Sequence, residues 1–362
     1  MLNSTINQSL NSLFDIAGNI QIEPNFRIYH PNYQPFALPT KIADRFQQNS
    51  PDLQHKYLTL LLRNFLYGIY YNGCLQNILA VNADTTHYTP HQNLEKNSTL
   101  GVDGEFYERL HNCNHGTGYF DPRWEVLRRE PDGSMAVTKG GLTLYVEPDC
   151  HLKPGSKSAT VGELISIWMP KNRLQNGCYL AVSNYGHQLQ HDPDNDLGAG
   201  RIYFNFTAFG AIALMDSLTL ELNAAGIPFS FQVLYNPCAY GRYDSGVLYF
   251  ERHDYPAIHQ ILQGAYAEHA SHFHPEIPLF TKFLAPGLGL AEEPNQKFAA
   301  QESFGMNRCQ IVANALLEAW KKGKNALDER MKVIDQHFAQ HLIDVRYPYL
   351  NPGSEDIYYP LK

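Results

Sequence analysis

The sequence is poor in cysteine and tryptophan and has no long apolar run. Its 362 residues include six cysteines and three tryptophans, and no two cysteines form a Cys-x-x-Cys pair. This wide spacing gives little support to a zinc or redox site, so we expect buried free thiols in a reducing cytosol. No apolar segment approaches the ~20 residues that a transmembrane helix needs. We therefore predict no metal site and no membrane span.

An excess of basic residues is also missing. The chain has 28 Lys and Arg against 36 Asp and Glu, which gives a formal net charge of −8. This balance argues against nucleic acid or a membrane surface as the main partner, although a local basic pocket is compatible with it. The Gly-rich segments GTGY and APGLGL lack the strand and helix context of nucleotide-binding loops. We predict no cofactor.

The first twenty residues lack the basic and apolar regions of a Sec signal. Their polar, Ser- and Asn-rich, amphipathic character would also suit a type III secretion address. We therefore expect a cytoplasmic protein, which is exported into a host only if it is a true type III effector.

Two regions of different pattern follow one another along the chain. Residues 1–80 show helical periodicity, and the polar, aperiodic segment 81–103 is typical of a linker. From about residue 105 the pattern alternates between short strands and helices. We predict an α+β protein with a mixed or antiparallel sheet and packed helices, divided into a helical region with linker (1–100) and a main domain (101–362).

Residues 200–249 carry the strongest functional signal, because polar side chains interrupt apolar strands. In GRIYFNFTAFG, the side chains of Arg201, Tyr203 and Asn205 alternate onto one face. Gln232 interrupts the strand PFSFQVLYNP in the same way. A strand face packed on a core is normally apolar, so these strands predict a polar pocket that suits an anion.

Three further residues fit such a pocket. RYDSGVLYF supplies Arg242 and Tyr249, and Arg308 stands near the start of a late helix, where the helix dipole favours an anion. Arginine binds phosphate or carboxylate bidentately and stays charged. The alternative is that these arginines pair with Asp244, Glu302 or backbone carbonyls and only hold the fold.

Two lysines are candidates for a general base. Lys139 precedes two glycines at the end of a strand, and Lys282 interrupts an apolar run, which favours burial and a lowered pKa. The alternatives are a turn lysine beside a β-bulge for Lys139, and snorkelling or pairing with Glu292 or Glu293 for Lys282.

Several segments taken together resemble the HopA-type family of type III effectors. The resemblance covers about residues 100–320. It is carried by NHGTGYFDPRWEV, DGSMAVTKGGLTLYV, RIYFNFT, GIPFSFQVLYNP, YGRYDSGVLYF, PLFTKFLAPGLGLAEEP and SFGMNRCQIVANALL. It implies a fold similar to the bacterial phosphothreonine lyases. It also implies one of two activities: phosphate elimination in lanthipeptide or thioamide-peptide biosynthesis, or the role of a translocated effector.

Elimination needs a base for the Cα proton, an acid for the departing phosphate, and arginines for the dianion. In the sequence pattern of the lyases, Asn205 occupies the position of the histidine that acts as the acid. Tyr203 occupies the position of the lysine just before that histidine, and Gln232 occupies the position of the lysine that acts as the base. The resemblance implies Arg242 and Arg308 as phosphate ligands beside Arg201, and Tyr249 as a site tyrosine. Asparagine and glutamine do not titrate at neutral pH.

The sequence therefore leaves two hypotheses. In the first, the chain is a carbon–oxygen lyase that forms dehydroamino acids from phosphoserine or phosphothreonine in a precursor peptide, with a kinase-like partner protein. Tyr203 then serves as the acid and Lys139 or Lys282 as the base. In the second, the chain is a non-catalytic effector or a phosphopeptide-binding module, because Asn205 and Gln232 cannot serve as acid and base.

Overall fold

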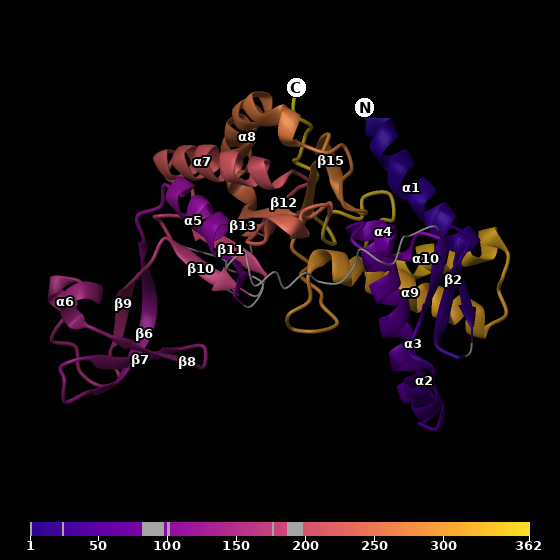
Figure 1. Cartoon of the computed structure of the whole chain (residues 1–362), viewed down its shortest axis with the longest axis horizontal. Coiled ribbons are helices and arrows are strands. Elements are labelled where there is room, and N and C mark those ends of the chain that lie inside the picture. Colours follow the sequence, from indigo (N-terminus) through magenta and orange to yellow (C-terminus); the bar gives the residue numbers. More distant parts are fainter. Residues whose placement is uncertain (1, 24, 82–97, 100–101, 176, 187–197) are drawn as a thin grey trace.

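The chain has the predicted α+β class, with antiparallel sheets and helices packed against them (Figure 1). The computed structural model describes residues 2–23, 25–81, 98–99, 102–175, 177–186 and 198–362. Most of the predicted linker at 81–103 and of the loop at 191–200 lies outside these residues. No helix in the described ranges is long and apolar enough to cross a membrane.

The N-terminal part contains a small sheet as well as the expected helices. Its helices are α1 (Leu2–Asn19), α2 (Thr40–Gln47), α3 (Pro51–Leu66), the π-helical turn η1 (Tyr67–Tyr71) and α4 (Gln76–Leu79). The sheet has the order β1 (Gln21–Glu23), β2 (Arg27–His30), β3 (Tyr33–Ala37). The helical prediction missed it because these strands are short, although β2 alternates between exposed and buried residues.

A second lobe is built on a four-stranded sheet with the order β8-β7-β6-β9. Its strands are β6 (Tyr119–Arg129), β7 (Met135–Lys139), β8 (Leu142–Val146) and β9 (Leu164–Met169), and α6 (Pro148–His151) lies beside them. The segment PDGS forms the turn of a hairpin, because β6 pairs with β7 in antiparallel register on either side of it. This lobe has its own small core around Trp124 and Ile167.

The central element is a seven-stranded antiparallel sheet with the order β10-β11-β13-β14-β12-β16-β15. Its strands are β10 (Asn172–Gln175), β11 (Cys178–Val182), β12 (Ala199–Phe204), β13 (Phe229–Leu234), β14 (Gly246–Glu251), β15 (Lys282–Ala285) and β16 (Leu288–Glu292). Two short strands, β4 (Ser98–Thr99) and β5 (Val102–Asp103), pair just before α5 (Gly104–Cys113).

The two faces of this sheet belong to different cores. One face packs under α7 (Ala208–Ala224) and α8 (Tyr255–His269), which lie above the strands in Figure 1. The other face contributes Tyr203 and Val247 to a core formed with the N-terminal helices, α9 (Phe304–Lys321) and α10 (Leu327–Gln340). The N-terminal part therefore shares its core with the end of the chain.

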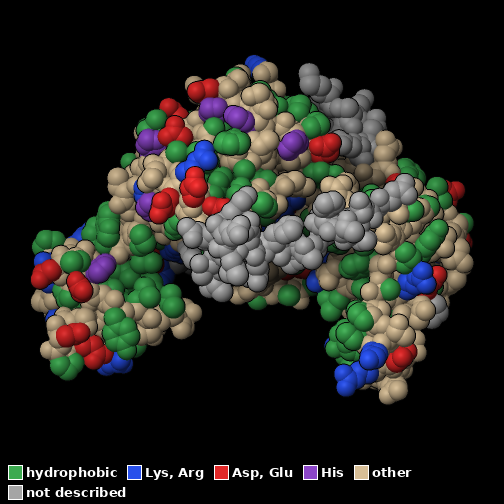
Figure 2. All heavy atoms as spheres, viewed as in Figure 1, with side chains coloured by type: hydrophobic (Ala, Val, Ile, Leu, Met, Phe, Trp, Pro, Cys, Tyr) green, Lys and Arg blue, Asp and Glu red, His purple; other side chains and the backbone are tan. Residues whose placement is uncertain are grey.

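The space-filling view is hollowed between two lobes (Figure 2). The lobe of β6–β9 stands on the left and the N-terminal elements stand on the right, with the central sheet above the hollow. The sheet face opposite α7 and α8 packs in part against the N-terminal helices and α9.

A close contact between α9 and η1 fixes the N-terminal part on the central sheet. A Cβ on Gly305 would overlap the ring of Tyr71, so only glycine allows this approach. We predict that Gly305→Ala lowers the free energy of unfolding by about 1–3 kcal/mol, because the packed ring must move. Chemical denaturation measures this change.

The matched control is Gly264→Ala in α8, because a Cβ there meets no atom within 4 Å. Alanine favours the helix by about 1 kcal/mol over glycine. Equal effects of the two substitutions would contradict the role given to the contact between α9 and η1.

Candidate functional site

The seven-stranded sheet brings four of the predicted site residues onto one face. Arg201 pairs with Tyr249 across β12 and β14, while Tyr203 and Gln232 both pair with Val247. Paired residues point to the same side of a sheet. We call the face that carries Arg201, Tyr203, Gln232 and Tyr249 the polar sheet face.

Alternation along the strands explains why the polar sheet face exists. The intervening residues Ile202, Phe204, Phe231 and Leu248 are fully buried in the core under α7 and α8. Because successive side chains of a strand point to opposite faces, burial of these apolar residues on one face places the polar residues between them on the opposite face.

Three of the four side chains, those of Arg201, Tyr249 and Gln232, contact one another, while the ring of Tyr203 packs against Tyr71 and Phe304. The guanidinium of Arg201 lies 4.9 Å from the centre of the Tyr249 ring and forms an ion pair with Glu293, just after β16. Tyr249 donates its hydroxyl proton to Gln232 Oε1 at 2.9 Å, and Gln232 Nε2 lies 3.0 Å from Cys178 Sγ. Arg201, Tyr249 and Gln232 therefore form one connected network.

Two donor groups near this face are buried without an acceptor among the described residues. They are Arg201 Nε and the hydroxyl of Tyr203, whose side chain is 3% exposed. Burial raises the pKa of Tyr203 to about 12, and the nearby charge of Arg201 opposes this shift. Tyr203 is consequently a neutral phenol at pH 7. Its oxygen interacts with the Tyr71 hydroxyl, while its own proton and the proton of Arg201 Nε have no acceptor among the described residues.

Arg242 lies just before β14 and is held by the N-terminal part. Its Nε and Nη2 bond to the two oxygens of Asp244 at 2.5 and 2.8 Å. Burial lowers its pKa, but Asp244 outweighs this effect, so the pKa lies above its ordinary value. Asp244 also accepts a hydrogen bond from Tyr67 of η1 at 3.3 Å. The backbone N–H of Tyr243 donates a hydrogen bond to the carbonyl of Asn72 at 2.9 Å, which places the loop of Arg242 against the N-terminal helices.

Asn205 and Arg308 hold other parts of the fold. Asn205 follows β12, is 2% exposed, and donates from Nδ2 to the carbonyl of Glu276 at 2.9 Å. Arg308 in α9 is 1% exposed and donates to the carbonyls of Pro348 and Leu350. Burial lowers its pKa to about 10, so it remains charged at pH 7. For Arg308 the structure matches the alternative in which arginines bond to backbone carbonyls.

Neither candidate lysine lies on the polar sheet face. Lys139 ends β7 in the separate lobe, where its Nζ lies 3.0 Å from both oxygens of Asp121 and 2.8 Å from the carbonyl of Pro122. Lys282 begins β15 and is 6% exposed. Its Nζ lies 2.5 Å from Asp356, so it is paired with a carboxylate, although not with Glu292 or Glu293.

Sequence reasoning missed Arg173, Tyr67 and Cys178 at this site. Arg173 in β10 pairs with Leu180, which pairs with Gln232, so Arg173 extends the polar sheet face to the edge of the sheet. The alternation in this short strand was the available signal. Tyr67 carried no signal, because its role depends on a contact 177 residues away.

All six cysteines are free, as expected, but the expectation of burial was wrong for three of them. Cys74, Cys150 and Cys238 are exposed. The expectation rested on composition alone, which does not place a residue in the fold.

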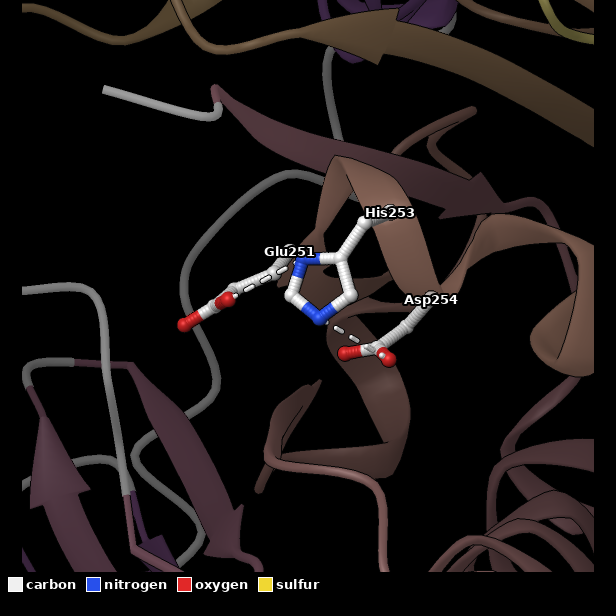
Figure 3. A group of neighbouring side chains, drawn as sticks. All are labelled: Glu251, His253 and Asp254. Carbon is white, nitrogen blue, oxygen red and sulfur yellow. Dashed lines mark ion pairs between the residues drawn. The ribbon is translucent and has the colours of Figure 1, made fainter. Parts of the chain in front are cut away.

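A second group of titratable residues lies at the end of β14. His253 Nδ1 lies 3.3 Å from Glu251, and its Nε2 lies 3.3 Å from Asp254 (Figure 3). The two ring nitrogens therefore face different carboxylates. His253 therefore lies between two carboxylates just before α8, and one possible metal-ligand atom of each of the three residues lies within 4.8 Å of the others.

The architecture and the polar sheet face define an α+β protein with arginine and phenol groups on one side of its central sheet. Residues 169–350, half of the chain, match the model of the HopA1 effector protein family, and the chain belongs to that family. The matched residues include β10–β16 and α7–α10, and so the whole polar sheet face.

Two solved structures from this comparison are effector proteins of Pseudomonas syringae. The protein from pathovar syringae strain 61 is 13% identical, with 96% of this chain and 98% of that chain covered and a TM-score of 0.45. The protein from pathovar tomato strain DC3000 is 15% identical, with 68% and 80% covered and a TM-score of 0.40. No curated protein sequence matches the chain.

The position of Lys282 gives a direct test of its structural role. We predict that Lys282→Met lowers the free energy of unfolding by about 3 kcal/mol, because Asp356 loses its partner in a largely buried pair. Thermal or chemical denaturation measures this loss.

The control is Lys157→Met, which breaks an exposed ion pair with Asp149 and should have a much smaller effect. If Lys282→Met leaves stability unchanged and abolishes an activity, Lys282 is a functional base after all.

Proposed function

We propose that the polar sheet face binds the phosphorylated side chain of a serine or threonine in a peptide. The observation that carries this proposal is the pair of buried donors, Arg201 Nε and the Tyr203 hydroxyl, which have no acceptor among the described residues. Buried donors without partners are costly, so a ligand that accepts from both is favourable there.

The charges of the site favour a dianion. Arg201 and Arg242 are each held by one carboxylate, Glu293 and Asp244 respectively. A phosphoryl group carries close to two negative charges near pH 7 and three acceptor oxygens. It can therefore accept from a guanidinium group and a phenol at the same time, which a single carboxylate does less well.

The surroundings favour a peptide over a small anion. The arginines keep some contact with solvent, because the side chain of Arg201 is 14% exposed and that of Arg242 is 30% exposed. Gln232 and Tyr249 at the same face offer further hydrogen-bonding groups beside the arginines. As a member of an effector family, such a protein would act in the cytoplasm where it is made or, as a true effector, inside a host.

Elimination of the phosphate is the second candidate, because Tyr203 is a buried neutral acid beside Arg201. A base removes the Cα proton, its electron pair forms the Cα–Cβ double bond, and the Cβ–O bond breaks. Tyr203 then gives its proton to the departing phosphate oxygen. With Lys139 and Lys282 placed elsewhere, Glu293 is the carboxylate that contacts Arg201 and would take the Cα proton. A kinase-like partner would supply the phosphorylated precursor peptide.

Fluorescence anisotropy with a labelled phosphothreonine peptide tests the binding proposal. We predict that Arg201→Gln and Arg242→Gln each weaken binding by ~10–100-fold, because each removes charge-assisted hydrogen bonds. Arg346→Gln is the matched control, because Arg346 is exposed and pairs only locally with Asp344. Equal binding of the phosphorylated and unphosphorylated peptides would refute the proposal.

Mass spectrometry of the same peptide after incubation separates binding from elimination. A lyase removes the elements of phosphoric acid from the peptide, and Tyr203→Phe then binds the peptide more weakly and stops this loss even when the variant is saturated with peptide. A phosphopeptide that binds and stays intact identifies a binding module. Loss of phosphoric acid at an undiminished rate in Tyr203→Phe would remove Tyr203 from its assigned role.

A further inference from the structure

Arg173 is a second arginine on the polar sheet face, at the edge of the sheet nearest the β6–β9 lobe (Figure 1). Its guanidinium contacts the hydroxyl of Tyr119 and lies 5.7 Å from the centre of that ring. Tyr119 begins β6 and is 1% exposed. The guanidinium of Arg173 therefore packs against the buried ring of Tyr119, between the central sheet and the lobe.

Arg173 differs from Arg201 and Arg242 in having no carboxylate partner. No ion pair joins it to an acidic residue in the part of the chain that the structure describes, and its Nε is buried without an acceptor there. The carboxylate of Asp121 two residues beyond Tyr119 is already bound by Lys139 and by Nε1 of Trp124. The charge of Arg173 is consequently left without compensation, which is unfavourable for a partly buried cation.

We propose that Arg173, together with Tyr119, forms a second anion subsite that binds an acidic or phosphorylated residue of the same peptide. This inference rests on the proposed function, because the first anion is the phosphorylated residue at Arg201 and Arg242. It adds a requirement on the substrate: the peptide carries two anionic side chains at a defined separation.

The order of the strands sets that separation. Arg173 lies on β10 and Arg201 on β12, with β11, β13 and β14 between them. Four steps of ~4.8 Å between neighbouring strands give ~19 Å. An extended peptide advances ~3.3 Å per residue, so the second anionic residue stands about six positions from the phosphorylated one.

Four phosphothreonine peptides test the inference by anisotropy with the full chain. One has a single glutamate six positions before the phosphothreonine, one has it six positions after, one has it two positions after, and one has glutamine throughout. We expect one of the two six-position peptides to bind about tenfold more tightly than the glutamine peptide, and the two-position peptide to gain much less. A second phosphothreonine in place of that glutamate shows whether a phosphoryl group or a carboxylate is preferred.

Arg173→Gln should remove the roughly tenfold advantage of the six-position glutamate and weaken binding of the glutamine peptide by much less than tenfold. Arg173→Lys should retain part of it. The matched control is Arg128→Gln, because Arg128 also lies against a tyrosine, Tyr145, but already has Glu130 as its partner. Circular dichroism and thermal melting confirm that each variant is folded.

The outcomes separate the two proposals. If the wild-type chain binds no phosphothreonine peptide, the proposed function fails and the subsite fails with it. If the chain binds the phosphothreonine peptides with equal affinity whatever the position of glutamate, only the subsite is overturned. An Arg173→Gln variant that is less stable but keeps the preference for glutamate would also overturn it, because its role would then be structural.

Discussion

The structure depends on the two-sided character of the central sheet. Each strand from β11 to β16 anchors one set of side chains under α7 and α8. Because the side-chain period is two, the residues between them must face the other way. Arg201, Tyr203 and Tyr249 are therefore held on the polar sheet face by the burial of Ile202, Phe204 and Leu248, a constraint that a one-residue slip would destroy.

A second constraint is the pairing of buried charge, and it decides which charged residues are available for a ligand. Glu292 is 2% exposed and accepts hydrogen bonds from Arg252, Ser354 and Tyr358. Lys282 and Arg308 bond to the same C-terminal segment. These groups hold the C-terminal segment against the sheet and α9. Their charges are therefore already bound within the protein and are not free to bind a ligand. Arg201 and Arg242 are also paired, with Glu293 and Asp244, and in the proposed function the anionic ligand replaces these carboxylates.

Much of the fold was predictable from the sequence, and so was the core of the candidate site. The polar interruptions in β12 and β13 indicated the face that carries Tyr203 and Gln232 correctly, because alternation is a local property. The sequence misplaced what depends on long-range contacts. Asn205 stands one step beyond the end of β12 and turns toward Glu276, and Lys139 lies in a different sheet. Neither fact follows from spacing along the chain.

The central claim is that a phosphorylated side chain binds where the two buried donors lack an acceptor. A crystal structure of the chain with a phosphothreonine peptide tests it most directly. The account predicts phosphoryl oxygens within hydrogen-bonding distance of Arg201 Nε and the Tyr203 hydroxyl. A phosphoryl group bound elsewhere, with these two donors still unpaired, would contradict the account.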